Sequence, residues 1–379
     1  MGSRMRRANG EGLVRQRPDG RWEARVDAGG PNGYRVRKSI YGRTKAEVAA
    51  KLRQTTLSLE RGHSVTDERM TVETFLTTWL SDVVQPAKRH STWQGYSVNV
   101  NRHLLPLIGR RTLAKLSPAD VQAVINAKRR EGLSPRTVQY IHATLRAALG
   151  VALRWGMVDR NVATLVEPIQ VRRPPAVPFS PDEVKKLLQV TSLDRLSAFW
   201  TVALAVGLRP SEALGLRWSD VDFDNGRLFV RHTLEHRDGG WSLQPPKSQT
   251  SRRTIPLPSV CVAALRAHQG RQEGERAMAF KWEEHDLVFT NEGGAPLSRT
   301  LVSHRFSQLQ KQAGIRHHRL YDCRHTAASL LLAQGVAARV VMEVLGHSSY
   351  ALTMDTYTHV LPTLMRDAAD AMDRSFDEF

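Results

Sequence analysis

Hydrophobic and polar residues alternate along the first forty residues of the chain, with polar turns between the alternating runs. This alternation predicts three strands, and the glycine- and proline-rich segments between them predict turns. Thr44 and Glu47 have the spacing of a helix-capping box, and apolar residues recur at helical intervals after them. We therefore expect a small three-stranded sheet followed by one helix. The strands are expected at 13–17, 21–27 and 34–41, with turns at 18–20 and 29–33.

The pattern changes to helical periodicity over residues 67–168. A first helix is expected over 72–84, where apolar side chains share one face, and a second helix is expected to end before Pro106. Two serines followed by proline, Ser117 and Ser134, have the pattern of N-caps and open two further helices. This part of the chain is therefore predicted to form a bundle of four helices.

Prolines at 168, 174, 175 and 178 mark a break after this bundle. Closely spaced prolines exclude helix and favour extended chain, so residues 169–179 are expected to be a stiff linker. Ser180 and Glu183 form a second capping box, and a sheet is expected between Leu228 and Leu257 in an otherwise helical segment. The expected fold class is multidomain and mainly α with small β parts. Its domains are a sheet with one helix (1–63), a helical bundle (67–168) and a mixed α+β domain (180–379).

The chain of 379 residues is strongly basic, with a formal net charge of +18 and a pI near 10.5. Residues 1–63 hold 15 basic and 6 acidic residues, a net charge of +9, whereas residues 64–168 carry +6 and the remainder +3. Such a charge indicates a polyanionic partner, above all nucleic acid. Arginines on the predicted strands suit contact with DNA phosphates. They lie at 15, 17, 21, 25, 35 and 37, beside Trp22 and Tyr34.

Two further features bear on where the chain acts. The cysteines, Cys261 and Cys323, are far apart and lack metal-ligand spacing, so neither a disulfide framework nor a zinc site is expected. The longest strongly apolar stretch, 198–208, is too short to span a bilayer, and the basic N-terminus lacks the apolar core of a signal peptide. We therefore expect a protein of a reducing, cytoplasmic compartment that is not targeted to a membrane.

Residues able to perform chemistry gather in the second half of the chain. Arg209 stands in Gly-Leu-Arg-Pro-Ser-Glu, Arg324 in Tyr-Asp-Cys-Arg-His-Thr, and Tyr357 ten residues after His347 in Leu-Gly-His. Guanidinium forks match phosphate oxygens, and a phenolic oxygen can form a covalent phosphoester. Together these side chains could grip a phosphodiester and attack it. Their order and spacing resemble those of the tyrosine recombinases, the phage-type integrases, over essentially the whole chain.

The resemblance implies a role for each of these positions. Arg209 and Arg324 are expected to clamp the scissile phosphate, and Tyr357 to be the nucleophile. The remaining site residues are Glu212, which would buttress the clamp, His347, which would bond the phosphate, and Lys247, the general acid on a mobile hairpin. The resemblance also makes residues 1–63 an arm-type DNA-binding domain, 67–168 a core-binding domain, and 180–379 a catalytic domain with a C-terminal tail.

One position departs from the family pattern. The family's second box is usually His-x-x-Arg, whereas here Tyr321 precedes Arg324. Tyrosine, with a pKa near 10, is a poor base at neutral pH, so Tyr321 is expected to act as a hydrogen-bonding partner. His325 and His318 are the alternative bases.

No metal or other cofactor is expected, because the sequence has neither a metal-ligand set nor a phosphate-binding loop, and arginines and lysine can supply the electrostatics. We expect a site-specific recombinase that forms a 3′ phosphotyrosine at double-stranded attachment sites and acts as a homotetramer. A host DNA-bending protein and an excision factor are open as further partners. The alternatives are a DNA-relaxing topoisomerase with the same chemistry and a non-catalytic DNA-binding regulator. The apolar positions within 361–379 predict a tail helix that docks on its own domain or on a neighbouring subunit.

Overall fold

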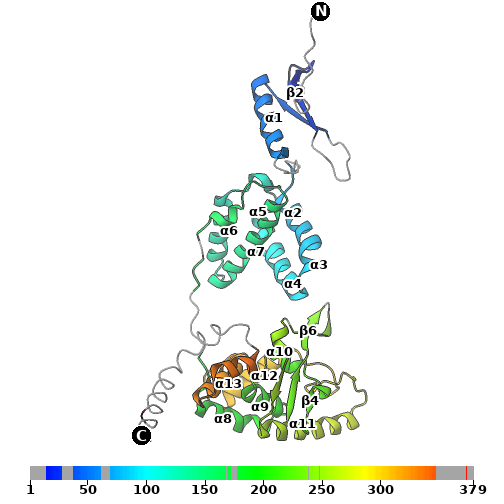
Figure 1. Ribbon diagram of the computed structural model, residues 1–379, viewed down its shortest axis with the longest axis vertical. Helices are drawn as coiled ribbons and strands as arrows, with labels where there is room; N and C mark the ends of the chain where they lie inside the picture. The colour runs from blue at the N-terminus through cyan, green and yellow to red at the C-terminus, as the bar shows by residue number, and fades with distance from the viewer. Residues whose placement is uncertain are drawn as a thin grey trace, which may run out of the picture. The chain divides into compact units, whose positions relative to one another are not determined.

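The structure is a computed structural model that describes residues 14–27, 37–60, 69–167, 169–171, 177–237, 239–246, 248–346 and 373. The chain divides into two compact units, Met1–Arg173 and Pro174–Phe379 (Figure 1). Several predictions fall outside the described residues. They are the second turn of the N-terminal sheet, residues 172–176 of the linker, the positions of Lys247, His347 and Tyr357, and the tail helix.

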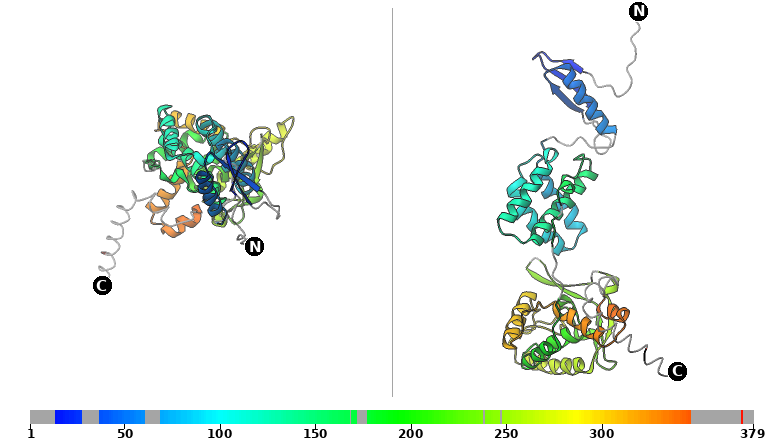
Figure 2. Two further views of the ribbon diagram at one scale, coloured as in Figure 1. Left: turned by 90° about the horizontal axis from the view of Figure 1, so that it is seen from above. Right: turned by 90° about the vertical axis from the view of Figure 1, so that its left-hand side faces the viewer.

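The N-terminal part is an antiparallel sheet of β1 (Val14–Gln16), β2 (Trp22–Asp27) and β3 (Arg37–Gly42), in that order. The predicted turn is present: Gly20 has a φ of +80° and donates to the Arg17 carbonyl at 3.0 Å. Helix α1 (Lys45–Glu60) packs on the sheet, as the right-hand view of Figure 2 shows. Its start is capped as expected, because Glu47 N donates to Thr44 Oγ1 at 3.2 Å.

The two faces of this sheet differ in chemistry. Ala24, Val26 and Ile40 are buried with Val48 of α1. On the other face, Glu23 is buried beneath two arginines: Arg15 Nε donates to its Oε2 at 2.9 Å, and Arg25 Nε to its Oε1 at 3.0 Å. Strand alternation thus separates an apolar core from a basic face.

The bundle follows the predicted pattern and differs in one place. Its first helix is α2 (Val72–Thr78), continued by the π-helical η2 (Trp79–Val84) and the short α3 (Gln85–Ala87). The second is α4 (His90–Val98), continued by η3 (Asn99–Leu104) and α5 (Leu105–Ile108). The predicted end before Pro106 is wrong. Because the π-helical turns restart the helix there, Pro106 falls in the first turn of α5, where a missing N–H costs nothing.

The last two helices of the bundle, α6 (Pro118–Arg130) and α7 (Pro135–Arg154), begin where the sequence predicts. Ser117 Oγ accepts from Asp120 N, and Ser134 Oγ from Thr137 N, each at 3.2 Å. Two 3₁₀ turns, η4 (Leu113–Lys115) and η5 (Val162–Leu165), pack with them. A continuous apolar core joins all of these helices.

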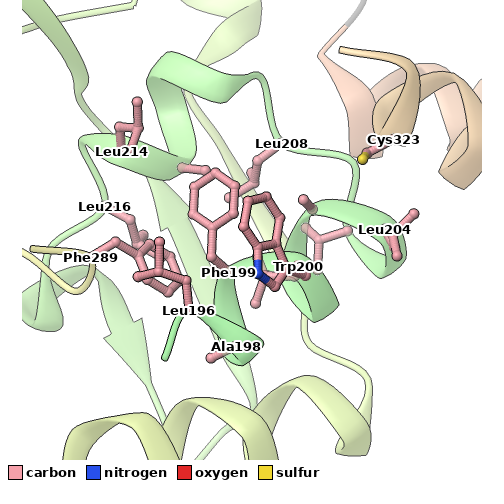
Figure 3. Close-up of a cluster of buried hydrophobic side chains, with 14 of the residues drawn as sticks. Leu196, Ala198, Phe199, Trp200, Leu204, Leu208, Leu214, Leu216, Phe289 and Cys323 are labelled. Atoms are coloured by element: carbon pink, nitrogen blue, oxygen red, sulfur yellow. The ribbon is translucent and has the colours of Figure 1, made fainter. Parts of the chain in front are cut away.

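The second unit is built around α9 (Ser197–Ala205), whose side chains are buried on nearly every side. Phe199 and Trp200 lie at the centre of the cluster in Figure 3. Helices on several sides cover this core. They are α8 (Pro181–Thr191), α10 (Pro210–Leu214), α11 (Ser259–Met278), α12 (Arg299–Gln312) and α13 (Asp322–Ala333), with α14 (Ala338–Leu345) packed on α13. No helix in the described parts of the chain has the length and apolarity needed to cross a membrane.

The sheet expected between Leu228 and Leu257 is present in two pieces. One joins β4 (Val221–Asp222), β5 (Arg227–Val230) and β8 (Arg253–Pro256), and the other is the hairpin of β6 (Thr233–Arg237) and β7 (Gly240–Gln244). The 3₁₀ turns η6 (Trp218–Asp220) and η7 (Gln249–Ser251) precede β4 and β8. The segment between β7 and β8 therefore includes position 247.

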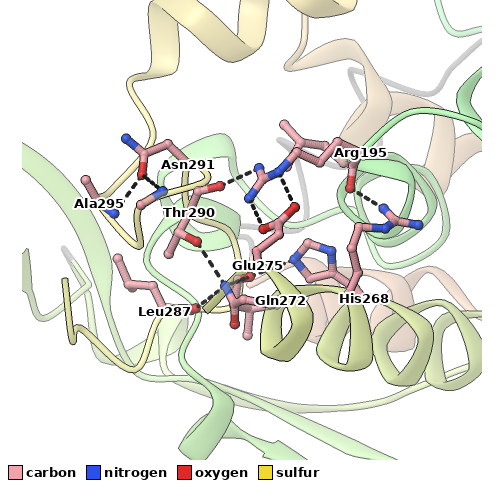
Figure 4. Close-up of polar contacts among 12 residues, drawn as sticks. Arg195, His268, Gln272, Glu275, Leu287, Thr290, Asn291 and Ala295 are labelled. Atoms are coloured by element: carbon pink, nitrogen blue, oxygen red, sulfur yellow. Dashed lines mark hydrogen bonds and ion pairs between the residues drawn. The ribbon is translucent and has the colours of Figure 1, made fainter. Parts of the chain in front are cut away.

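A polar network fixes the 287–295 segment to α11, as Figure 4 shows. Arg195 donates to Glu275 Oε2 at 2.5 Å and to the Thr290 carbonyl at 2.7 Å. Gln272, which is buried, donates to Thr290 Oγ1 at 3.0 Å. Because the buried Gln272 and Thr290 and the half-buried Arg195 and Glu275 have partners within the chain, this cluster serves the fold.

Candidate active site

Arg209 stands at the start of α10, where the chain turns from extended to helical. Its backbone N–H donates to Glu212 Oε2 at 3.0 Å, and its Nη1 donates to Glu212 Oε1 at 2.6 Å. Its Nη2 donates to the Gly346 carbonyl at 2.8 Å. The side chain is 29% exposed and therefore remains in part accessible to solvent.

Glu212 is held by a second arginine, Arg253 at the start of β8. Arg253 Nη2 donates to Glu212 Oε2 at 3.0 Å, and its Nη1 lies 3.3 Å from Oε1. Burial raises the pKa of the Glu212 carboxyl, but the charge and hydrogen bonds of Arg253, with the charge of Arg209, outweigh burial and lower the pKa below its usual value. Glu212 is therefore a buried carboxylate shared by two guanidinium groups.

Arg324 lies in the first turn of α13 and is only 1% exposed. Its Nη1 donates to the Gly207 carbonyl at 2.9 Å, and its Nη2 donates to the Leu345 carbonyl. Its buried Nε has no hydrogen-bond partner among the described residues. Burial, together with the nearby charge of Arg209, lowers the pKa of Arg324 to about 10, so the group stays charged at neutral pH.

The last turn of α14 joins these three arginines. The carbonyls of Val344, Leu345 and Gly346 accept from Arg253, Arg324 and Arg209 respectively, one guanidinium for each carbonyl. A helix C-terminus leaves such carbonyls without intrahelical partners and carries partial negative charge. Three cations from three separate elements therefore meet at the end of the helix that directly precedes His347.

Two glycines allow this close approach. Gly207 has a φ of +69°, and a Cβ there would lie 2.8 Å from Cδ2 of Leu345 and 3.0 Å from Cβ of Ala327. Gly346 ends α14 with a φ of +66°, and a Cβ there would lie 3.1 Å from Nη1 of Arg253. Both positions combine a backbone conformation that favours glycine with contacts that leave no room for a side chain.

Tyr321 is the N-terminal flanking residue of α13, half-buried, and its carbonyl accepts from Arg324 N at 3.1 Å. Its ring meets that of His325 edge-on, with centroids 5.3 Å apart. Burial lowers the pKa of His325, which favours the neutral imidazole. Both side chains thus lie at the same end of α13 as Arg324.

The other alternative base, His318, is engaged in packing. Its buried ring stacks on Phe179 with centroids 3.8 Å apart, and its Nε2 lies 3.6 Å from Glu183 Oε1. Burial lowers its pKa. His318 therefore packs between the start of α8 and the segment that follows α12.

The structure thus brings together Arg209, Glu212 and Arg324 among the predicted site residues. Sequence reasoning assigned no role to Arg253, which lies six residues after Lys247. The sequence did offer a signal for Arg253. It lies two residues before the apolar Ile255 in a predicted strand, so both side chains are on the same face, and an arginine on a buried face needs a partner. In the described parts of the chain no group of His, Cys, Asp and Glu is arranged to hold a metal ion.

Comparison with known proteins agrees with this geometry. Residues 178–363 match the model of the phage integrase family, and residues 71–129 match the phage integrase N-terminal SAM-like domain. An integrase of Streptomyces ambofaciens is 32% identical, with 98% of each chain covered. The chain belongs to the phage integrase family. It is therefore a tyrosine-type site-specific DNA recombinase of the kind found in phages and mobile elements.

A further relative and two solved structures are also similar to this chain. A XerC-like tyrosine recombinase of Caldanaerobacter subterraneus is 28% identical, over 91% of this chain and 93% of its own. The recombinase fold is shared with the Tn1549 transposon integrase, solved with transposon right-end DNA (TM-score 0.67, 21% identity, 79% and 100% of the two chains). It is also shared with lambda integrase, solved as a tetramer on a Holliday junction (TM-score 0.58, 17% identity, 93% and 96%).

Proposed function

We propose that this recombinase integrates and excises a phage or mobile element by cutting each DNA strand with Tyr357. The Tyr357 oxygen forms a bond to phosphorus, and the bond from phosphorus to the 5′ oxygen breaks with its electron pair on that oxygen. Lys247 gives a proton to the leaving oxygen, and the phenol proton passes to His325 or to water. The product is a 3′ phosphotyrosine and a free 5′ hydroxyl, and attack by the partner strand's hydroxyl reverses the step.

The buried guanidinium of Arg324 is the observation that carries this proposal. Placing an ion in the protein interior costs several kcal/mol, on the order of the penalty known for buried ions, unless an opposite charge or enough hydrogen bonds compensate. Arg324 has two carbonyl partners, yet its Nε has none among the described residues. A phosphate oxygen would supply both the missing acceptor and the negative charge.

The charge of the site supports a phosphoryl-transfer role. Arg209, Arg253 and Arg324 contribute three positive charges against the single negative charge of Glu212. This excess favours an anion, and it favours the more negative transition state of phosphoryl transfer over the diester itself. We assign Arg209 and Arg324 to the phosphate clamp, Glu212 to holding Arg209, and Tyr321 to a hydrogen bond near the phosphate.

The last turn of α14 also supports the roles proposed for the segment that follows it. Gly346, which directly precedes His347 in the chain, accepts a hydrogen bond from Arg209. We propose that His347 bonds the phosphate. We further propose residues 1–63 as the arm-binding domain, 67–168 as the core-binding domain, 169–179 as the linker, and 180–379 as the catalytic domain with its tail.

The proposal also covers the oligomeric state of the recombinase, its accessory partners and its cellular compartment. The recombinase is proposed to act as a homotetramer on double-stranded attachment sites, with the tail docking on a neighbouring subunit. Support comes from lambda integrase, which shares the fold and has been solved as a tetramer bound to a Holliday junction. A host DNA-bending protein and an excision factor are proposed accessory partners, and the bacterial cytoplasm is the proposed setting, in keeping with bacterial relatives.

A nicked suicide substrate tests the chemistry. Incubated with excess chelator, the protein should form a covalent adduct with DNA, because arginines and a lysine supply the positive charge. Tyr357→Phe should form none, and Arg324→Lys should cleave about 100- to 1000-fold more slowly, since lysine cannot reproduce the fork. Loss of the adduct in chelator, or its survival in Tyr357→Phe, would overturn the proposal.

The same assay separates the rival functions. A regulator without chemistry would bind the site and give no adduct. A plain topoisomerase would give the adduct but would not join two duplexes at defined sites. Joining of two marked duplexes, read on a gel, therefore distinguishes recombination from both alternatives.

A further inference from the structure

Arg253 has no assigned role, yet it contacts three separate segments of the candidate active site. Its side chain is 6% exposed. It grips both oxygens of Glu212, its Nε donates to the Val344 carbonyl at 2.5 Å, and its Nη1 donates to the Ser251 carbonyl at 3.0 Å. One guanidinium thus joins α10, the end of α14 and the turn before β8.

The turn held by Arg253 directly follows Lys247. Ser248 Oγ lies 2.9 Å from Thr250 Oγ1 and 2.9 Å from Ser251 Oγ, and Ser251 N donates to the Ser248 carbonyl at 3.1 Å. Ser251 is buried, and Thr250 O would lie 3.1 Å from a Cβ on Gly346. Residues 248–251 therefore form a compact turn with its own hydroxyl network, fixed at one end by Arg253.

We propose that Arg253 is a positioning residue that holds the turn of residues 248–251, which directly follows Lys247 in the chain, against the phosphate clamp. This inference rests on the proposed function, in which Lys247 protonates the leaving oxygen. Arg253 is bonded to the clamp through Glu212 and the Val344 carbonyl of α14, and to the turn through the Ser251 carbonyl. The position of the turn relative to the clamp therefore depends on this one guanidinium. A general acid must lie within hydrogen-bonding reach of its target, so a small displacement of the turn slows the proton transfer.

The fork of the guanidinium is essential to this arrangement. Arginine supplies donors in fixed directions to four acceptors at once, whereas a lysine ammonium has three rotatable donors on a flexible stem. Arg253→Lys keeps the positive charge beside Glu212 and loses the simultaneous grip. This variant therefore separates alignment of the turn from charge at the site.

The test compares two nicked substrates that differ in one atom at the scissile phosphate. The first has the ordinary 5′ oxygen, and the second has sulfur there, which leaves as a thiolate and needs no proton because thiols are far more acidic than alcohols. Arg253→Lys should cleave the oxygen substrate about 10- to 100-fold more slowly than the parent. It should cleave the sulfur substrate within about threefold of the parental rate, as should Lys247→Ala.

Matched controls separate the effect on cleavage from effects on DNA binding and folding. Arg252→Lys makes the same chemical change at the neighbouring exposed arginine and should leave both rates unchanged. Binding to an uncleaved core site should match the parent in all three variants, and the thermal midpoint should match the parent in Arg252→Lys and Lys247→Ala. If Arg253→Lys does not fold, Ser248→Ala, which removes the hydroxyl bonds of the same turn, should show the same substrate dependence with a smaller defect.

Several outcomes would overturn the inference. If Arg253→Lys is slowed equally on both substrates, the residue acts through the clamp or the fold and not through the acid. If it cleaves the oxygen substrate at the parental rate, the alignment is unnecessary. If Lys247→Ala is not rescued by sulfur, the role of Lys247 fails and the inference fails with it. If the parent forms no adduct at all, the proposed function itself is wrong.

Discussion

At the scale of single residues, the site is defined by where charge is buried. Arg324 and Arg253 have almost no exposed side chain, and Glu212 is buried between Arg253 and Arg209. Removing one partner of such a set leaves the others uncompensated, which typically costs about 3–5 kcal/mol. The half-buried Tyr321 differs, because its side chain lies at the edge of this set and can be changed with little loss of stability.

Tyr321 therefore offers a test of the departure from the usual histidine. Tyr321→His should retain most of the cleavage activity, because imidazole can also donate a hydrogen bond to a phosphate. Tyr321→Ala should cleave about 10- to 1000-fold more slowly, the effect of losing a positioning or acid–base group. Single-turnover cleavage of the suicide substrate measures both. Alanine cleaving as fast as the parent would show that this position lies outside the site.

At the scale of elements, the site depends on how closely three segments approach one another. The loop before α10 passes Arg324 of α13 and Leu345 of α14 at Gly207, and a glycine is needed for both the backbone angle and the space. The capping box of α8 has a comparable role at the edge of the domain. There Glu183 accepts from Ser180 N at 2.8 Å and from Arg316 Nε at 2.8 Å.

Gly207→Ala should destabilise the catalytic unit by roughly 2–4 kcal/mol, because a strained φ and a clash with Leu345 act together. Gly226→Ala is the matched control. Gly226 also has a positive φ, of +58°, but its nearest neighbour would be the Leu257 carbonyl at 4.0 Å. This variant should lose only about 1 kcal/mol. Equal losses in urea denaturation would mean that packing at Gly207 is not tight.

The lowered pKa of Glu183 predicts that the free energy of unfolding depends on pH. Burial raises its pKa, but hydrogen bonds from Arg316 and from the Ser180 backbone outweigh burial and lower the pKa from 4.5 to about 2. A lowered folded-state pKa stabilises the protein above the unfolded value, and this contribution is lost as the pH falls from 4.5 toward 2. Glu183→Gln should therefore be less stable than the parent at pH 7, and this difference in stability should be smaller at pH 3. A gap that does not change between these two pH values in urea denaturation would contradict this.

At the scale of the whole molecule, charge is distributed unevenly along the chain. Residues 1–63 carry half of the net charge of +18, and the N-terminal sheet has a basic face where Arg15 and Arg25 flank Glu23. The sheet also has its own small core with α1. These features suit a DNA-binding module whose contribution to affinity is largely electrostatic.

Deletion of residues 1–63 should therefore remove high-affinity binding to distal sites and flatten the salt dependence of DNA binding. Fewer phosphate contacts release fewer counterions, and one of two linked binding modules is lost. Cleavage of a suicide core site should persist, because Arg209, Arg253 and Arg324 all belong to the second unit. Footprints and salt titrations measure both effects, and an unchanged salt slope in the truncated protein would argue against a separate module.

The sequence by itself determined the elements and the family. Alternation in the first forty residues, capping serines before proline and the apolar stretch that became α9 each depend on neighbours a few positions away, so local pattern was sufficient. It failed at Pro106, where π-helical turns restart the helix. The order of Arg209, Arg324 and Tyr357 likewise indicated a recombinase before any contact was known.

Only the tertiary structure decided how the arginines are used. Arg253, Arg324 and Arg209 donate to three successive carbonyls at the end of α14, and these partners lie between 21 and 137 positions away in the sequence. Hydrogen bonds over such separations follow from the packing of α13 and α14 and from the space left at Gly207, none of which has a local signature. The role of Arg253 became visible for the same reason, because its partners come together only when α10, β8 and α14 are folded against one another.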